Sequence, residues 1–157
     1  MKLSDFITED SIVEELKATD KDSVIRELVG TLRKAGRILE EDVPVIIKAL
    51  IRREELGSTG IGRGIAVPHT KHERVKSLIG AFGRSSNGIE FNALDEGLVR
   101  WVFLLLSPPE NPREHLAALE HISRLLRSKT FCDRLDAAVT KEDLIGIIRN
   151  SADYIEV

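Results

Sequence analysis

The order of the hydrophobic patterns constrains the fold of this chain more than any other feature. Before Gly57 the apolar residues recur at helical spacing, after it they form short runs separated by turn residues, and beyond Pro109 helical spacing returns. Helices on both sides of a block of strands indicate a sheet covered by helices on both faces. The 157 residues contain no internal repeat or low-complexity tract, so residues 1–157 are expected to form one α/β domain.

Capping residues and periodicity divide the chain into five expected helices and five expected strands. The first helix is expected between Asp20 and Gly36, and the second from about Asp42 to Glu55. The other three are expected from Pro112 to about Arg127, from Lys129 to Ala138, and after Thr140. The strands are Ser11–Leu16, Ile65–Val67, Leu78–Phe82, Ile89–Phe91 and Val99–Leu106. The segments SSNG (85–88) and NALDEG (92–97) are interpreted as turns, and Asn111 as the cap before Pro112.

Charge and composition exclude several classes of protein. The net charge of −3, with acidic and basic residues interleaved, argues against nucleic acid as a partner. Cys132 is the only cysteine, which excludes an internal disulfide and favours a reducing compartment. The N-terminus does not resemble a signal peptide, and the apolar run Val102–Leu106 is too short for direct insertion into a membrane. The protein is therefore expected to be soluble and cytoplasmic.

The chain has four histidines, and their spacing disfavours a metal site. His115 and His121 lie six positions apart on one expected helix and do not share a face. His69 and His72 lie in a turn, with no cysteine or carboxylate at a recognised ligand spacing. Neither a metal nor any other cofactor is expected.

The glycine-rich segment from Gly57 to Gly64 also fits no nucleotide motif. It lacks the Gly-Lys-Ser/Thr ending of a P-loop, and a helix precedes it where the dinucleotide fingerprint requires a strand. It does offer backbone N–H groups beside two hydroxyls, which can hold a phosphoryl group. Ser58, Thr59, Gly60 and Gly62 are the candidates for that support. The alternative is that the segment is only a tight connection.

Two polar residues occupy positions that the helical period assigns to the core. Arg53 continues the stripe of Ile46 and Leu50 just before the glycine-rich segment, and His115 heads the stripe of the later helix. Each could be a structural residue at the margin of the core, with Arg53 extending its charge to water. Together with His69, which follows Pro68, they could instead hold a phosphoryl group, because guanidinium and imidazole groups donate to phosphate oxygens. A neutral imidazole is also a good nucleophile near pH 7.

These residues match a known pattern. The run from Arg53 to Gly62, continuing from Gly64 to His69, resembles the signature of the IIA domains of the fructose/mannitol class, EIIA type 2, of the phosphoenolpyruvate-dependent phosphotransferase system. The segments from Glu114 to Ser123 and at Leu125–Leu126 resemble the second motif of that family. The similarity covers nearly the whole chain.

The resemblance implies a fold and a reaction. The fold is a three-layer α/β/α sandwich with a mixed sheet. His69 would accept a phosphoryl group on its Nε2 atom, supported by Arg53 and His115, from a histidine phosphocarrier protein (HPr or a nitrogen-type homologue). The chain would thus be a phosphotransferase with a phosphohistidine intermediate. Two positions depart from the pattern: Thr70 follows the histidine where glycine is common, and Arg63 is expected to place an extra charge beside it.

Three functions remain open within this resemblance. A chain without an appended domain is most similar to the nitrogen-regulatory IIA proteins, which bind and regulate target proteins. A sugar-specific IIA would instead pass the phosphoryl group to a cysteine of a IIB domain. A binding module that is never phosphorylated, on the same scaffold, is the third possibility.

Overall fold

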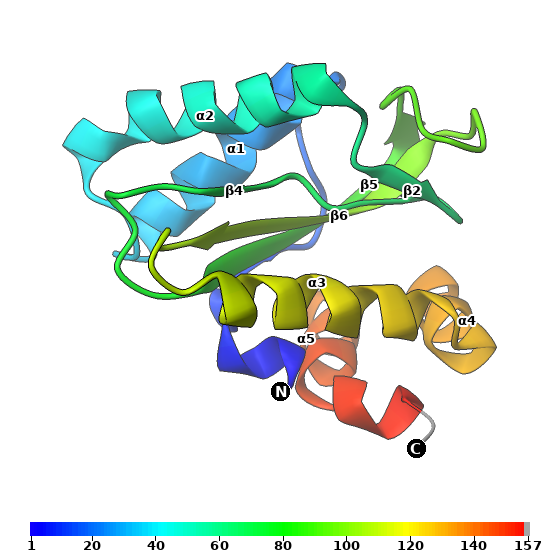
Figure 1. Ribbon diagram of the computed structural model, residues 1–157. Helices are drawn as coiled ribbons and strands as arrows, with labels where there is room; N and C mark the ends of the chain where they lie inside the picture. The colour runs from blue at the N-terminus through cyan, green and yellow to red at the C-terminus, as the bar shows by residue number, and fades with distance from the viewer. Residues whose placement is uncertain (156–157) are drawn as a thin grey trace.

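The computed structural model describes residues 1–155 and has a mixed sheet with helices on both faces (Figure 1). The strands are β1 (Ile7–Val13), β2 (Gly60–Gly62), β3 (Ile65–Ala66), β4 (His69–Lys71), β5 (Ile79–Ile89) and β6 (Val99–Ser107). The helices are α1 (Lys21–Lys34), α2 (Val43–Leu56), α3 (Pro112–Leu126), α4 (Lys129–Ala137) and α5 (Lys141–Arg149), with 3-10 turns at Leu3–Asp5, Glu40–Asp42 and Ser151–Tyr154. The prediction of a three-layer α/β/α sandwich is confirmed.

Strand β6 is the centre of the sheet. The order is β1-β5-β6-β3-β2, and β4 pairs with β6 on the same side as β3 but further along the strand. Strands β5 and β6 are antiparallel, with Phe82 opposite Phe103, whereas β3 and β4 run parallel to β6. The register places His69 beside Leu105. Since β4 has no neighbour on its other side among the described strands, His69 lies at an edge of the sheet.

The alternation of side chains along β6 builds two separate cores. Val102, Leu104 and Leu106 are fully buried in the core formed with α1 and α2. The intervening side chains, Phe103 and Leu105 among them, belong to the core under α3, α4 and α5. Such a continuous apolar run is typical of a strand that is covered on both faces. In Figure 1, β4 passes between α2 on one side and α3 on the other.

The helix boundaries follow the predicted caps in most places. Asp20 accepts a hydrogen bond from the Ser23 N–H, and Thr140 and Asp143 form the expected capping box. Asn111 is the N-cap residue before Pro112, as predicted, although its side chain makes no capping hydrogen bond.

The strand predictions are less accurate. The first strand is Ile7–Val13 rather than Ser11–Leu16, and the predicted SSNG turn lies inside β5, where the register with β6 shifts between Arg84 and Ile89. Gly88 permits this irregularity with a φ of 81°. The two predicted strands on either side of SSNG are therefore one strand, and Phe91 lies beyond its end. The glycine-rich segment is the hairpin of β2 and β3 rather than a loop, and His69 begins a strand rather than lying in a turn.

Candidate functional site

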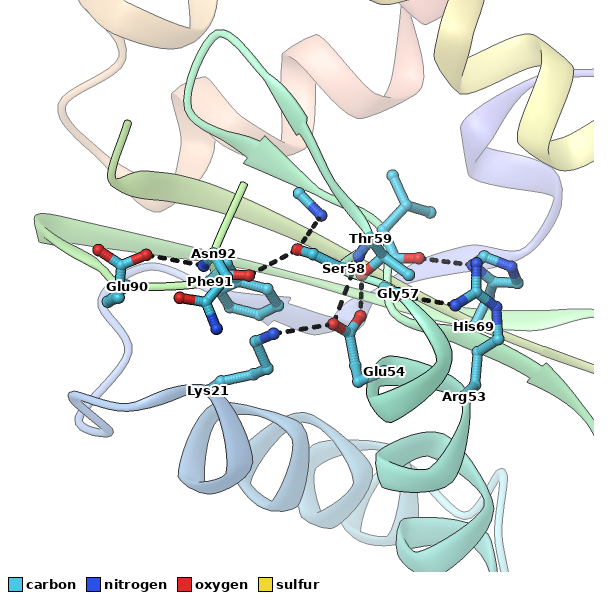
Figure 2. Close-up of polar contacts among 12 residues, drawn as sticks. Lys21, Arg53, Glu54, Gly57, Ser58, Thr59, His69, Glu90, Phe91 and Asn92 are labelled. Atoms are coloured by element: carbon cyan, nitrogen blue, oxygen red, sulfur yellow. Dashed lines mark hydrogen bonds and ion pairs between the residues drawn. The ribbon is translucent and has the colours of Figure 1, made fainter. Parts of the chain in front are cut away.

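The imidazole of His69 is half-buried at the sheet edge and is held by one backbone group (Figure 2). Its Nδ1 atom lies 2.7 Å from the carbonyl oxygen of Val67. Because a carbonyl can only accept, Nδ1 carries the ring proton and the lone pair of a neutral ring is on Nε2. The Pro68 carbonyl in turn accepts from the N–H of Leu105, which ties this segment to β6. The backbone thus holds the proton on Nδ1 and leaves the Nε2 lone pair free.

The pKa of His69 is lowered from its ordinary value of 6.5. Burial is the main cause and the charge of Arg53 adds to it, while the Val67 carbonyl and the Glu54 carboxylate act in the opposite direction. A lowered pKa keeps the ring neutral at pH 7, which is the form that can attack a phosphorus atom.

His115 lies close to His69 and belongs to α3, in the helical layer that also contains α4 and α5. It lies in the first turn of α3, its side chain is 4% exposed, and the centroids of the two imidazole rings are 5.5 Å apart. Its Nδ1 atom lies 2.5 Å from the hydroxyl oxygen of the fully buried Ser107. Burial, then the charges of His69 and Lys71, lower the pKa of His115 to about 4. A neutral His115 that accepts from Ser107 at Nδ1 has its proton on Nε2, where it can donate.

Arg53 lies in the last turn of α2, close enough for its charge to lower the pKa of His69. Its Nη1 atom donates to the Gly57 carbonyl oxygen at 2.9 Å. The prediction that Arg53 continues the buried stripe of α2 is wrong in detail. Arg53 is half-buried, and the neighbouring Glu54, four residues after Leu50, is the buried polar side chain.

The predicted phosphate-supporting groups of the glycine-rich segment have partners within the fold. The Ser58 hydroxyl donates to the Phe91 carbonyl at 2.5 Å and accepts from the Gly60 N–H at 3.0 Å. The Thr59 hydroxyl donates to the Glu54 carboxylate. Direct contact of these groups with a phosphoryl group stays a prediction.

The backbone of that hairpin requires glycine at the two other predicted positions, Gly60 and Gly62. A Cβ atom at Gly60 would lie 2.8 Å from the Cβ atom of Ala93, and Gly62 has a φ of 105°, a region that L side chains rarely adopt. Both glycines therefore shape the hairpin, whatever else they contact.

The expectation that Arg63 places a charge beside the nucleophile is wrong. Its guanidinium donates to the carbonyl of Leu126 at the end of α3. Leu126 follows His115 by eleven residues, which corresponds to about 16 Å along a helix. The charge of Arg63 is thus directed to the opposite end of the helix that carries His115.

Two residues near the site were missed by the sequence analysis. Glu54 had a detectable signal, because it lies four positions after Leu50 on the apolar stripe of α2. Ser107 had almost none, since it only ends the apolar run of β6 before Pro108. Among the described residues, no group of three or more His, Cys, Asp or Glu side chains could hold a metal ion. No helix in residues 1–155 combines the length and the apolar character needed to cross a membrane.

Comparison with known proteins agrees with this geometry. Residues 5–151 match the family model described as "Phosphoenolpyruvate-dependent sugar phosphotransferase system, EIIA 2". The chain belongs to this family. The EIIA type-2 domains take part in phosphoryl transfer between proteins, which accords with the neutral imidazole of His69 at an edge of the sheet.

The similar proteins include both nitrogen regulatory proteins and sugar-specific components of the phosphotransferase system. The chain is 31% identical over 148 residues to the nitrogen regulatory protein of Bradyrhizobium diazoefficiens, covering 94% of this chain and 95% of that protein. It is 34% identical over 148 residues to the fructose-specific EIIABC component of Bacillus subtilis, covering 94% of this chain but 23% of that protein. The crystal structure of nitrogen regulatory protein IIA-Ntr from Neisseria meningitidis superimposes with a TM-score of 0.82 at 29% identity, covering 93% of this chain and 98% of that one.

Proposed function

We propose that this protein accepts a phosphoryl group on Nε2 of His69 from a histidine phosphocarrier protein, either HPr or its nitrogen-type homologue. The observation that carries the proposal is the 2.7 Å contact between Nδ1 of His69 and the Val67 carbonyl. It assigns the proton to Nδ1 and leaves the Nε2 lone pair available in a ring that burial keeps neutral.

The transfer is a displacement at phosphorus. The Nε2 lone pair of His69 forms the new N–P bond, the N–P bond of the donor phosphohistidine breaks, and its electron pair returns to the donor ring. The His69 ring gains positive character while it carries the phosphoryl group, and the Val67 carbonyl stabilises the Nδ1 proton during that step. His115 can donate its Nε2 proton to a phosphoryl oxygen, and Arg53 supplies positive charge from α2. The two helical layers thus converge on one accepting atom.

A nitrogen-type regulatory role is favoured for the phosphorylated protein. The Bradyrhizobium relative and the Neisseria meningitidis structure, which superimposes with a TM-score of 0.82, both carry the name of a nitrogen regulatory protein. We therefore infer that the phosphorylation state of His69 controls contacts with regulated target proteins. The second candidate, favoured by the 34% identity to the EIIABC component, is a sugar-specific IIA that passes the group to a IIB cysteine.

Labelling tests the accepting atom. The protein is incubated with radiolabelled phosphoenolpyruvate, the first enzyme of the system and HPr, and the label is then tested for the acid lability and alkali stability of a phosphohistidine. Label is expected on the native protein and on His72→Ala, a matched loss of a neighbouring histidine, but not on His69→Ala. Label that persists in folded His69→Ala would remove His69 from the reaction, and an unlabelled native protein would favour the phosphorylation-independent binding module.

Discharge separates the two phosphorylated roles. The labelled protein is mixed with the purified IIB domain of a fructose system, and the rate of loss from His69 is followed. For the regulatory role we expect the label to stay on the protein many times longer than it stays on a fructose-specific IIA control. Rapid transfer to the IIB cysteine would establish the sugar-transport role instead.

A further inference from the structure

A buried ion pair lies directly behind the predicted site and is not accounted for by the phosphoryl transfer. Glu54 is 6% exposed at the C-terminal end of α2, where the helix dipole disfavours a carboxylate. Its carboxylate lies 3.1 Å from the ammonium group of Lys21, the first residue of α1. The Lys21 ammonium also lies 5.1 Å from the centroid of the Phe91 ring. A charge in such a position destabilises the fold unless its partners compensate.

The carboxylate of Glu54 is bonded to the glycine-rich turn. It accepts from the Thr59 hydroxyl and, at 3.3 Å, from the Thr59 N–H (Figure 2). Arg53, the preceding residue, holds the Gly57 carbonyl at 2.9 Å. Consecutive side chains of α2 therefore fix both ends of the Gly57–Thr59 turn, one with a positive and one with a negative charge.

Hydrogen bonds continue from this turn to the nucleophile. The Thr59 carbonyl accepts from the Val67 N–H at 3.0 Å, and the Val67 carbonyl accepts from Nδ1 of His69 at 2.7 Å. Glu54 is thus connected to His69 through two residues, Thr59 and Val67. The path leads to the one carbonyl that determines which ring nitrogen of His69 is free. Burial lowers the pKa of His69 and the Glu54 charge opposes that lowering, so the charge is also felt at the ring.

We propose that Glu54, balanced by Lys21, is a positioning residue that fixes the Gly57–Thr59 turn and, through Thr59 and Val67, the ring orientation and tautomer of His69. Its effect on the reaction rate rests on the proposed function, whereas its effect on the tautomer does not. The pair also explains why α1, which contributes no residue to the site itself, begins next to the turn.

The test uses variants of both partners in the full-length protein. Glu54→Gln keeps an acceptor for Thr59 but removes the charge, Lys21→Met leaves the carboxylate without its cation, and Lys21→Arg restores a cation. Glu27→Gln is the matched control, because Glu27 also accepts backbone N–H groups but those of Lys17 and Ala18, before α1. Nitrogen-15 NMR of the His69 ring reports the tautomer, transfer from phosphorylated HPr reports the rate, and urea unfolding reports the folded fraction.

In Glu54→Gln and Lys21→Met we expect a mixture of His69 tautomers and a phosphorylation rate at saturating donor that falls about tenfold, with an unchanged half-saturating donor concentration. Lys21→Arg and Glu27→Gln should retain the native tautomer and rate. If Glu54→Gln does not fold, Lys21→Met decides, because its rate and tautomer are compared per folded molecule and urea unfolding gives the folded fraction. A native tautomer and a native rate per folded molecule in Lys21→Met and in any folded Glu54→Gln would overturn the proposal and leave the pair a purely structural role. A native protein that HPr does not label would refute the proposed function, while the tautomer measurement would still decide the positioning role.

Discussion

Replacing His115 with asparagine should remove a specific part of the acid sensitivity of the fold. The side chain is 4% exposed, and burial and the neighbouring charges lower its pKa from 6.5 to about 4. In the folded protein the neutral form is favoured, so below pH 6.5 the unfolded chain binds a proton more readily. The stabilisation from the neutral ring is therefore fully present above pH 6.5 and is lost as the pH falls towards 4.

The size of this contribution follows from the two pKa values. One pKa unit corresponds to about 1.4 kcal/mol, so the change from 6.5 to about 4 corresponds to about 3 kcal/mol of unfolding free energy. Asparagine places its amide group near the position of Nδ1, where it can still form a hydrogen bond with the Ser107 hydroxyl. It has no titrating group in this range. His115→Asn should therefore lose about 3 kcal/mol less than the native protein between pH 7 and pH 4.

Urea unfolding at intervals between pH 7 and pH 4, followed by circular dichroism, measures this difference directly. The other titrating groups change their protonation in both proteins. The difference between the two curves of unfolding free energy against pH therefore isolates the contribution of His115. The matched control is His72→Asn, at a histidine whose Nδ1 accepts from the Arg74 N–H away from the pair. Parallel curves for the native protein and His115→Asn would refute the reasoning, because they would mean that burial does not disfavour the charged ring.

Substitutions at three further positions separate the groups around the site. Arg53→Ala should slow phosphorylation about 100-fold while the fold is retained, because a guanidinium that stabilises the transferring charge is lost; an unchanged rate would remove Arg53 from the reaction. Ser107→Ala should cost about 1–3 kcal/mol in urea unfolding, since the buried Nδ1 of His115 loses its partner, and Ser107→Thr should recover part of that loss. Gly60→Ala should destabilise the fold by about 1–3 kcal/mol, because its Cβ would lie 2.8 Å from that of Ala93, and native stability would show that the hairpin can shift.

Local sequence determined the helices of this protein and the motif that indicates its family. Helical periodicity and caps such as Asp20 and Thr140 act within a few residues, so a sequence pattern contains the information that forms them. The order of helical and strand patterns likewise predicted the three layers. The motif that ends at His69 is contiguous and indicated the family.

Pairing between distant segments decided what the sequence could not show. The SSNG segment reads as a turn, but pairing with β6 on both sides of it makes it part of β5. The sequence shows Glu54 only as a polar residue in a helix. Its burial and its role follow from contacts with Thr59 and with Lys21 at the start of α1. His69 lies 46 residues from His115, and only the parallel pairing of β4 with β6, under α3, brings their rings to 5.5 Å. Periodicity records which face of an element is buried, but the partner that covers that face is fixed only when the whole chain packs.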